Sequence, residues 1–519
     1  MFILFTVSLL FITALALLLL RWLKPDFRAA WLVAVGGALL AWITVLLWQW
    51  QFPVKLTLPA WQPAILFADA PVFLADGLSW PYAFSLVTLA LATMLTAISR
   101  ENFGTTSAWA GILTLTGIGL LAVLADNPLT LVLTWAAIDL AELVIMLRAV
   151  YGEKLRERVV VSFATRIAGI LFLLWAHIAS ISQGTTLNFA EIPPQVGPYL
   201  LLAAGLRLGV LPVHLPFISE ASLHRGFGTA LRLTSAASSL ALLSRIPPHS
   251  ITGPWATFLF ILTSFAALYG SWMWFRTKKV LNARPYWLIG MGALSIAAAL
   301  RGNSIGSVAW GSSLILGGGA LFLSSVDQKW LTRLLLVGLF GISALPFSLN
   351  ASGWVNSTSE QWIFWLFFTP AQILLLTGYI QHAQNTKGSS FDSQPKWAQI
   401  IYPAGIALPL LVMLALGVWG WQGAQTLGIW WPGSLATFLT IILVWLRPRL
   451  RIFNPVQVHW IQPTTSSTLE RLYSNLWALY RLLNRLVNFV TRVLESDGGI
   501  IWTILFIIVF ASMLSGGTR

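Results

Sequence analysis

The chain has 519 residues, of which 57% are hydrophobic and 9% charged, whereas a soluble domain carries roughly a quarter charged residues. This composition excludes a soluble protein and predicts apolar segments of about 20 residues that cross a lipid bilayer. No cysteine is present, which excludes disulfides, cysteine-bound iron–sulfur clusters and thiol catalysis, so redox chemistry on this chain is not expected. The net charge of +14 is scattered through short loops, and we therefore expect no nucleic-acid partner.

Apolar segments taken in chain order predict an all-α polytopic membrane protein with sixteen crossings. The first segment has neither a basic leader nor a small-residue cleavage site, so we interpret it as a transmembrane helix and not as a removed signal peptide. The predicted segments are 2–22, 29–50, 79–99, 107–125, 128–149, 158–182, 198–217, 228–246, 254–275, 284–300, 303–325, 331–349, 360–382, 399–421, 427–446 and 498–515.

Lysine and arginine are concentrated in the loops that follow odd-numbered segments, whereas the opposite loops carry only Lys55, Arg245 and Arg301. Because positively charged loops are retained on the cytoplasmic side, we expect the N-terminus outside and the basic loops in the cytoplasm, with a bacterial inner membrane as the location. The basic residues of these loops include Arg21, Lys24, Arg28, Arg148, Lys154, Arg156, Arg158, Arg276, Lys278, Lys279, Arg284, Arg447, Arg449 and Arg451.

An amphipathic helix is predicted at 468–494, between the last two segments. Its apolar face holds Leu472, Leu476, Leu479, Leu483, Leu486 and Val490, and its polar face holds Arg471, Asn475, Arg481, Asn484, Asn488 and Arg492. At 1.5 Å per residue the helix is about 40 Å long, which suits a position along the membrane interface or along a neighbouring helix bundle. The alternative is a free surface helix.

Two predicted segments are interrupted by helix-breaking residues. The seventh contains Gly209, Pro212 and Pro216, and the twelfth contains Gly341 and Pro346. Proline removes a backbone donor, so both helices are expected to break within the membrane.

These interruptions predict a pair of inverted repeats. If each repeat has five helices, the broken helix is fourth in each, and the odd number inverts the second repeat, as in transporters with a central ion path. The prolines could instead be packing kinks. The predicted parts are an N-terminal three-helix segment 1–106, repeats 107–246 and 254–382, core helices 399–446, lateral helix 468–494 and last transmembrane helix 498–515.

Few ionisable residues lie within the predicted segments, and each is expensive to bury, so each is a candidate for a proton path. Asp139 and Glu142 are three residues apart and share a helical face, where they could share a proton or pair with an arginine. The same groups could simply hold helices together. The candidates are Asp139, Glu142, Arg166, His177, Arg207 and Arg232, all in the first repeat.

The second repeat is nearly empty of ionisable side chains within its segments, so a proton path there would depend on water. No phosphate loop, nucleophile–base arrangement or cluster of metal ligands is recognisable in the chain. We therefore expect no active site for a covalent reaction, no metal and no cofactor on this chain.

Five stretches resemble the antiporter-like membrane subunits of respiratory complex I, Mrp-type cation/proton antiporters and membrane-bound hydrogenases. They are DGLSWPYAFSLVTLAL (76–91), ADNPLTLVLTW (125–135), LRLGVLPVHLPF (206–217), TALRLTSAASSLALLSR (229–245) and GISALPFSLN (341–350). The resemblance implies about fourteen core helices with inverted repeats, a lateral helix and a final transmembrane helix, in a complex with other membrane subunits.

The resemblance also implies a series of titrating residues, most of which are missing here. The glutamate of the family falls on Ala136 and its seventh-helix lysine on Arg207, while the eighth-helix position falls on Leu231 or Arg232. The later positions fall near Gly318 and on Trp354. Arginine stays protonated, so Arg207 cannot pass on a proton as a lysine would.

Three functions follow from these patterns. The leading hypothesis is an antiporter-like subunit of a complex-I-related (NADH:quinone oxidoreductase-type) assembly, which moves protons through the first repeat or, having lost key charges, serves as its scaffold. The second is a non-conducting structural subunit that docks neighbours through the lateral helix. The third is an Mrp-type antiporter subunit or a stand-alone secondary transporter.

Overall fold

The computed structural model describes residues 2–24, 27, 29–59, 70–99, 105–150, 153–193, 195–217, 225–251, 254–354, 361–385, 395–421 and 430–450. The chain divides into two compact units, Met1–Leu446 and Arg447–Arg519, and the architecture below is that of the first. The predicted lateral helix 468–494 and last transmembrane helix 498–515 lie outside the described residues.

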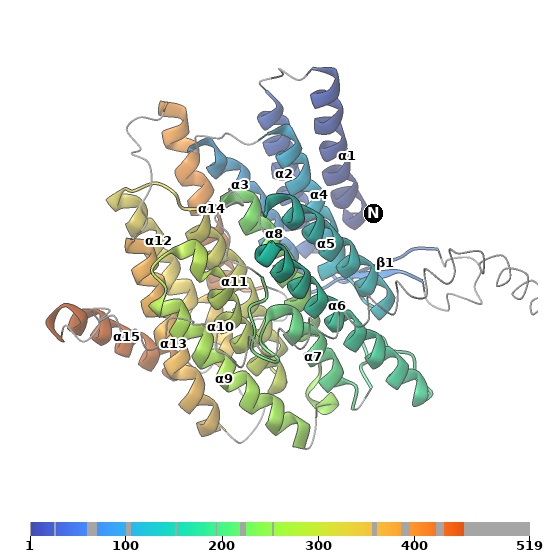
Figure 1. The fold of residues 1–519 in the computed structure, drawn as a ribbon, viewed down its shortest axis with the longest axis vertical. Coiled ribbons are helices and arrows are strands. Elements are labelled where there is room, and N and C mark those ends of the chain that lie inside the picture. The colour runs from blue at the N-terminus through green and yellow to red at the C-terminus, as the bar shows by residue number, and fades with distance from the viewer. Residues whose placement is uncertain are drawn as a thin grey trace, which may run out of the picture. The chain divides into compact units, whose positions relative to one another are not determined.

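Fifteen α-helices form the described part of the chain, and together with their apolar surface they make it an all-α polytopic membrane protein (Figure 1). By length and composition alone, nine of the described helices could cross a membrane. The helices are α1 (Phe2–Leu23), α2 (Ala30–Leu47), α3 (Trp80–Thr96), α4 (Thr106–Val123), α5 (Pro128–Ala149), α6 (Glu153–Ser182), α7 (Gly197–Leu208), α8 (Arg225–Ser244), α9 (Pro254–Arg276), α10 (Val280–Leu300), α11 (Ser304–Leu323), α12 (Lys329–Ile342), α13 (Gln361–Gln384), α14 (Lys396–Trp419) and α15 (Trp431–Leu450).

The helix bounds follow local capping signals as well as hydropathy. Asn127 accepts a hydrogen bond from the Thr130 backbone N–H at the start of α5, with Pro128 in the first turn. Asn303 does the same for Gly306 at the start of α11. Such caps satisfy backbone donors that have no partner within the helix, which is why these helices begin where they do.

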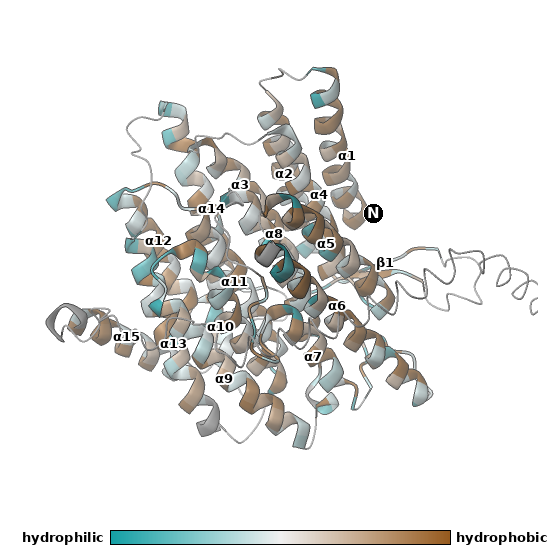
Figure 2. Ribbon diagram, viewed as in Figure 1, coloured by the Kyte–Doolittle hydropathy of each residue, from teal (hydrophilic) through white to brown (hydrophobic). Residues whose placement is uncertain are grey.

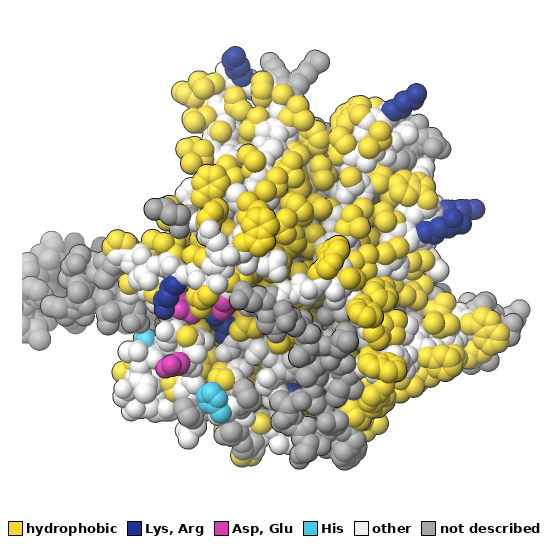
Figure 3. Space-filling model, turned by 180° about the vertical axis from the view of Figure 1, so that it is seen from behind, with side chains coloured by type: hydrophobic (Ala, Val, Ile, Leu, Met, Phe, Trp, Pro, Cys, Tyr) yellow, Lys and Arg dark blue, Asp and Glu magenta, His cyan; other side chains and the backbone are white. Residues whose placement is uncertain are grey.

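Burial distinguishes central helices from peripheral ones. Nearly every residue of α3, α8 and α11 is buried, whereas α1 and α6 present large apolar side chains outward. The outer helices α1 and α6 are largely brown, the colour of hydrophobic residues, in Figure 2. Hydrophobic side chains, drawn in yellow, dominate the face seen from behind in Figure 3. Apolar side chains on the outside are stable in a lipid environment, so the outer helices are suited to contact lipid.

Consecutive helices pack together in two sets of five. In the set α4–α8 each helix contacts the next, and α4 also contacts α8. In the set α9–α13 each helix again contacts the next, and α9 contacts α13. The two sets meet through contacts of α8 with α10 and α11.

A two-stranded antiparallel hairpin, β1 (Val54–Thr57) and β2 (Val72–Ala75), follows α2. The Leu74 N–H donates to Leu124 O at 2.7 Å and the Asp126 N–H donates to Val72 O at 3.0 Å, so β2 is fixed to the turn between α4 and α5. The sequence predicts no element in this region, because strands of four residues are too short for a clear alternation of apolar and polar residues.

Candidate functional site

Five of the six candidate proton-path residues converge on one buried cluster. Asp139 and Glu142 come from α5, Arg166 from α6, Arg207 from α7 and Arg232 from α8. None of the five is more than 4% exposed. The cluster therefore joins four consecutive helices by charged contacts inside the protein.

Asp139 is bound by two arginines. The Arg207 guanidinium donates to both carboxylate oxygens, with 2.9 Å between Nη2 and Oδ1. Arg166 lies 3.5 Å from the same Oδ1. Arg207 also donates to the Ser239 hydroxyl at 3.3 Å and lies 4.2 Å from the Trp135 ring centroid, so α5 and α8 both hold its side chain in place.

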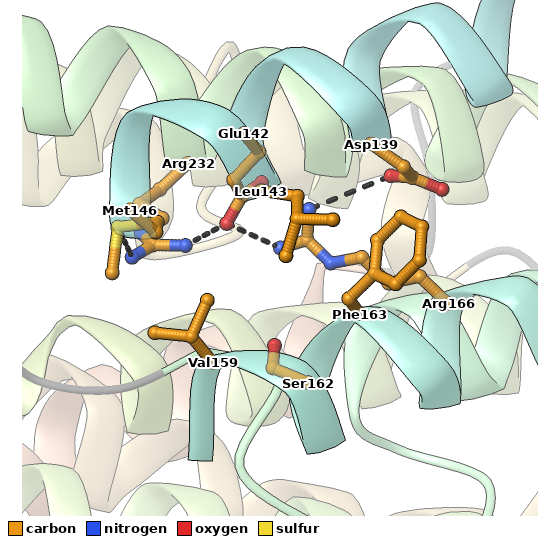
Figure 4. A pocket seen from close by; sticks show the side chains of 9 residues that line it. All are labelled: Asp139, Glu142, Leu143, Met146, Val159, Ser162, Phe163, Arg166 and Arg232. Atoms are coloured by element: carbon orange, nitrogen blue, oxygen red, sulfur yellow. Dashed lines mark hydrogen bonds and ion pairs between the residues drawn. The ribbon is translucent and has the colours of Figure 1, made fainter. Parts of the chain in front are cut away.

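Glu142 is bound by two arginines as well (Figure 4). Arg166 donates to both of its carboxylate oxygens, with 2.9 Å between Nη2 and Oε1, and Arg232 donates to Oε1. Arg232 also contacts Met146 Sδ at 3.1 Å and lies 4.4 Å from the Phe217 ring centroid. Arg166 is therefore shared by the two carboxylates.

The local sequence explains why these groups meet. Asp139 and Glu142 are three residues apart, so both face the same side of α5. Arg207 lies in the last turn of α7, where the helix dipole favours a positive charge. The helix ends at Gly209, whose φ of 73° is a left-handed conformation that glycine adopts without strain.

Positive charge exceeds negative charge in this cluster. Three arginines face two carboxylates, so the cluster carries one net positive charge when all five groups are ionised. A cavity of about 20 Å³ borders Glu142, Arg166, Arg232 and Ser162, which is room for about one water molecule. The site can therefore hold fixed charge and about one water molecule.

His177, the sixth candidate, is not brought to the cluster. It lies 11 residues beyond Arg166 on α6, which places it about 16 Å further along the helix axis. The structure therefore separates this histidine from the charges that the sequence grouped with it.

The helix ends inside both interrupted segments, at Leu208 in α7 and at Ile342 in α12. After α7, the chain turns through Pro212 and Pro216 without helix, and the Ser162 hydroxyl of α6 donates to Pro216 O at 2.7 Å. After α12, the chain turns through Pro346 into a short 3₁₀ helix, η4 (Leu349–Trp354). Gly341 itself remains in the last turn of α12.

Aromatic side chains occupy the space at Gly318 and Trp354. The resemblance implies later titrating groups at these two positions. A Cβ on Gly318 would lie 2.5 Å from Trp287 Nε1, so the indole of α10 takes the space that a lysine would need. Trp354 is fully buried, 6.3 Å from the Trp310 ring centroid. Ala136 lies one helical turn before Asp139, so the carboxylate of α5 is present one turn further along.

Several polar residues are buried where the sequence predicts no buried polar group. Arg284, expected in a cytoplasmic loop, is 6% exposed within α10 and donates to Thr229 Oγ1 at 3.3 Å. Arg245, expected in an outer loop, is buried and donates to Asp76 Oδ2 at 3.1 Å. His382, at the end of a predicted segment, is 1% exposed. Hydropathy alone could not identify them, because all three lie near helix ends.

No protein-family model matches the sequence, and no curated protein matches it significantly. Solved structures do match. A chain of the Mrp complex from Dietzia sp. DQ12-45-1b has a TM-score of 0.70 at 17% identity, covering 100% of this chain and 63% of that one, so this chain spans less than two thirds of its length.

Two further structures are similar. A chain of the membrane-bound sulfane sulfur reductase, an archaeal respiratory membrane complex, has a TM-score of 0.64 at 11% identity, covering 98% of this chain and 100% of that one. A chain of respiratory complex I from Thermus thermophilus with bound aureothin has a TM-score of 0.56 at 18% identity, covering 80% and 97%. These matches confirm the resemblance predicted from the sequence at the level of the fold, in a strongly diverged sequence.

Proposed function

We propose that this chain is an antiporter-like membrane subunit of a multisubunit assembly of the complex I or Mrp type, and that its buried charge cluster couples events in the assembly to proton movement. The fold similarity to chains of such complexes supports the first part. The convergence of five buried ionisable side chains from four helices carries the second part.

The two five-helix sets support an inverted-repeat architecture. Each set has the same pattern of contacts, and the helix that ends early, α7 or α12, is fourth in each. Because five helices are an odd number, the second set would cross the membrane in the opposite sense. Broken helices at matching positions of inverted repeats mark ion paths in transporters, and Arg207 lies at the first of these breaks.

The arrangement suggests how the cluster would work. In the described arrangement Asp139 and Glu142 are each paired with two arginines. A shift of α7 or α8 that withdraws Arg207 or Arg232 removes positive potential and allows a carboxylate to bind a proton. The return of the arginine then expels the proton, without any arginine losing its own.

Proton uptake by proteoliposomes tests this function. The vesicles would contain the complex purified by an affinity tag on this chain, with either the wild-type chain or the Glu142→Gln variant. Glu191→Gln is the matched control, because Glu191 is exposed outside the helices. Loss of uptake in Glu142→Gln alone, with an intact complex, is the expected result, and wild-type uptake in that variant would refute the proposal.

A second candidate, a non-conducting structural subunit, is favoured by the saturation of the carboxylates. Each carboxylate already has two arginine partners, an arrangement that holds four helices together whether or not a proton moves. If the subunit is structural, the docking of neighbouring subunits would depend on the predicted lateral helix 468–494. Deletion of 468–519 would then prevent assembly, whereas normal assembly of the truncated chain would exclude the docking role.

A further inference from the structure

Helix α13 carries a row of buried polar side chains in the half of the molecule that has few charges. Gln372, Tyr379 and His382 are at most 1% exposed. Their spacing of seven and three residues places them on one face of the helix, over about 15 Å of its length. That length is about half the hydrocarbon thickness of a bilayer.

Gln372 lies at the break of α12. Its amide nitrogen donates to Ile342 O at 3.3 Å and to Ser343 O at 3.0 Å, the carbonyls left without helical partners where α12 ends. The amide oxygen of Gln372, Oε1, is buried and has no hydrogen-bond partner among the described residues. A buried amide oxygen without a donor is costly, so this position favours a bound water.

His382 lies ten residues further along α13, beside α9. Its Nε2 lies 3.0 Å from Trp274 O, a carbonyl that can only accept, so Nε2 carries the hydrogen and Nδ1 is a bare acceptor. That Nδ1 is buried and, within the described part of the chain, has no partner. The ring packs 4.2 Å from the Trp274 ring centroid, which fixes its orientation.

Tyr379 stands between these two groups. Its hydroxyl donates to Leu335 O of α12 at 3.1 Å and keeps free lone pairs to accept a further hydrogen bond. The step from Tyr379 to His382 is one helical turn, and the step from Gln372 is about 10 Å. The longer step cannot be crossed by a direct hydrogen bond, and the buried Leu375 and Leu376 lie along it. A proton path along this face would therefore need water beside these two leucines.

We propose that the face of α13 formed by Gln372, Tyr379 and His382 is a hydrated track that carries protons between the end of α13 and the α12 break. Water binds at the two bare acceptors, Gln372 Oε1 and His382 Nδ1, and His382 is the one titratable imidazole on the track. In the predicted topology His382 is near the cytoplasmic end. This inference rests on the proposed proton function and assigns the second half its route.

The first test is proton uptake by the same proteoliposomes with His382→Phe, Tyr379→Phe and Gln372→Leu. Matched controls are His249→Phe and Tyr269→Phe, since His249 is exposed in the turn Pro248–Ser250 and Tyr269 is 43% exposed on α9. Each track variant is expected to slow uptake about tenfold or more, as removal of a proton-transfer group does. Wild-type uptake in all three variants would overturn the track.

The second test measures hydration without relying on transport. In deuterated water the C2 hydrogen of an imidazole exchanges only when water and protons reach the ring, and mass spectrometry of His382 peptides follows this exchange. Exchange within a few-fold of the rate at His249 supports a hydrated track, and no exchange overturns it. If the track variants slow uptake but Glu142→Gln does not, the proposed role of the first-half cluster fails while the track stands.

Discussion

Arg207, in the last turn of α7, binds both carboxylate oxygens of Asp139 on α5, 68 residues earlier in the chain. Replacement of Arg207 by methionine leaves the Asp139 charge with Arg166 alone. Breaking a buried pair in this way costs about 3–5 kcal/mol. We expect Arg207→Met to lower the free energy of unfolding by about this amount. The measurement is the denaturant midpoint of the purified chain in detergent.

The double variant Arg207→Met/Asp139→Leu removes both charges and separates a structural role from a functional one. If the pair only holds helices together, the double variant regains stability and proton uptake is unaffected. If the pair takes part in proton movement, stability returns and uptake stays low. Arg156→Met is a suitable control, because Arg156 is exposed at the start of α6.

Arg166 connects the two carboxylates, and only a planar guanidinium with several donors can bind Glu142 at two points and still reach Asp139. Arg166→Lys keeps the charge but loses this geometry, so we expect a loss of about 1–3 kcal/mol in unfolding free energy. Double-mutant cycles between Asp139→Asn and Glu142→Gln measure the coupling. The coupling energy should fall toward zero in the Arg166→Lys background; coupling of unchanged size would show that Arg166 does not link the carboxylates.

Gly209 positions the cluster through the end of α7. A Cβ there would lie 2.4 Å from His214 O and 2.8 Å from Pro216 Cδ, in addition to the strain of a φ of 73°. Gly209→Ala is therefore expected to destabilise the chain by more than the roughly 1 kcal/mol of left-handed strain alone, and to reduce proton uptake by moving Arg207.

Two other glycines separate these effects. Gly184 also has a positive φ, of 76°, but open space around its Cβ position, so Gly184→Ala reports the backbone strain alone. Gly36 has neither constraint, and Gly36→Ala should be neutral or slightly stabilising. Equal effects at Gly209 and Gly184 would contradict the steric account.

A second charged group holds the hairpin. Arg245, at the end of α8, donates to Asp76 at 3.1 Å and lies 3.9 Å from Asp126, and Lys55 of β1 lies 3.3 Å from Asp126. Arg245→Met should weaken the attachment of β2, so the Leu74 amide should exchange faster with deuterium. Amides at the centre of α11 are the internal reference, and equal acceleration there would indicate global unfolding instead.

Much of the fold was predictable from the sequence, because apolar segments of membrane length are a strong signal. The predicted segment 128–149 matches α5, and α7 and α12 end inside the segments predicted at 198–217 and 331–349. The hairpin β1–β2 was missed for lack of such a signal. The helices predicted at 468–494 and 498–515 stay predictions.

The candidate site was predictable only in part. The cost of buried charge identified Asp139, Glu142 and the three arginines, but which arginine binds which carboxylate depends on how α5–α8 pack, and no local pattern contains that information. The α13 track was missed for a different reason. Gln372 and Tyr379 are uncharged, so a search for intramembrane charge passes over them.

The most direct test of the central claim is proton uptake by proteoliposomes that contain the intact complex, comparing wild type with the Asp139→Asn/Glu142→Gln double variant. Both substitutions keep the size of the side chain and one acceptor oxygen while removing the groups that can bind a proton. Loss of uptake with normal assembly is the predicted result. Uptake at the wild-type rate would show that protons do not pass through this cluster and would contradict its role in proton translocation.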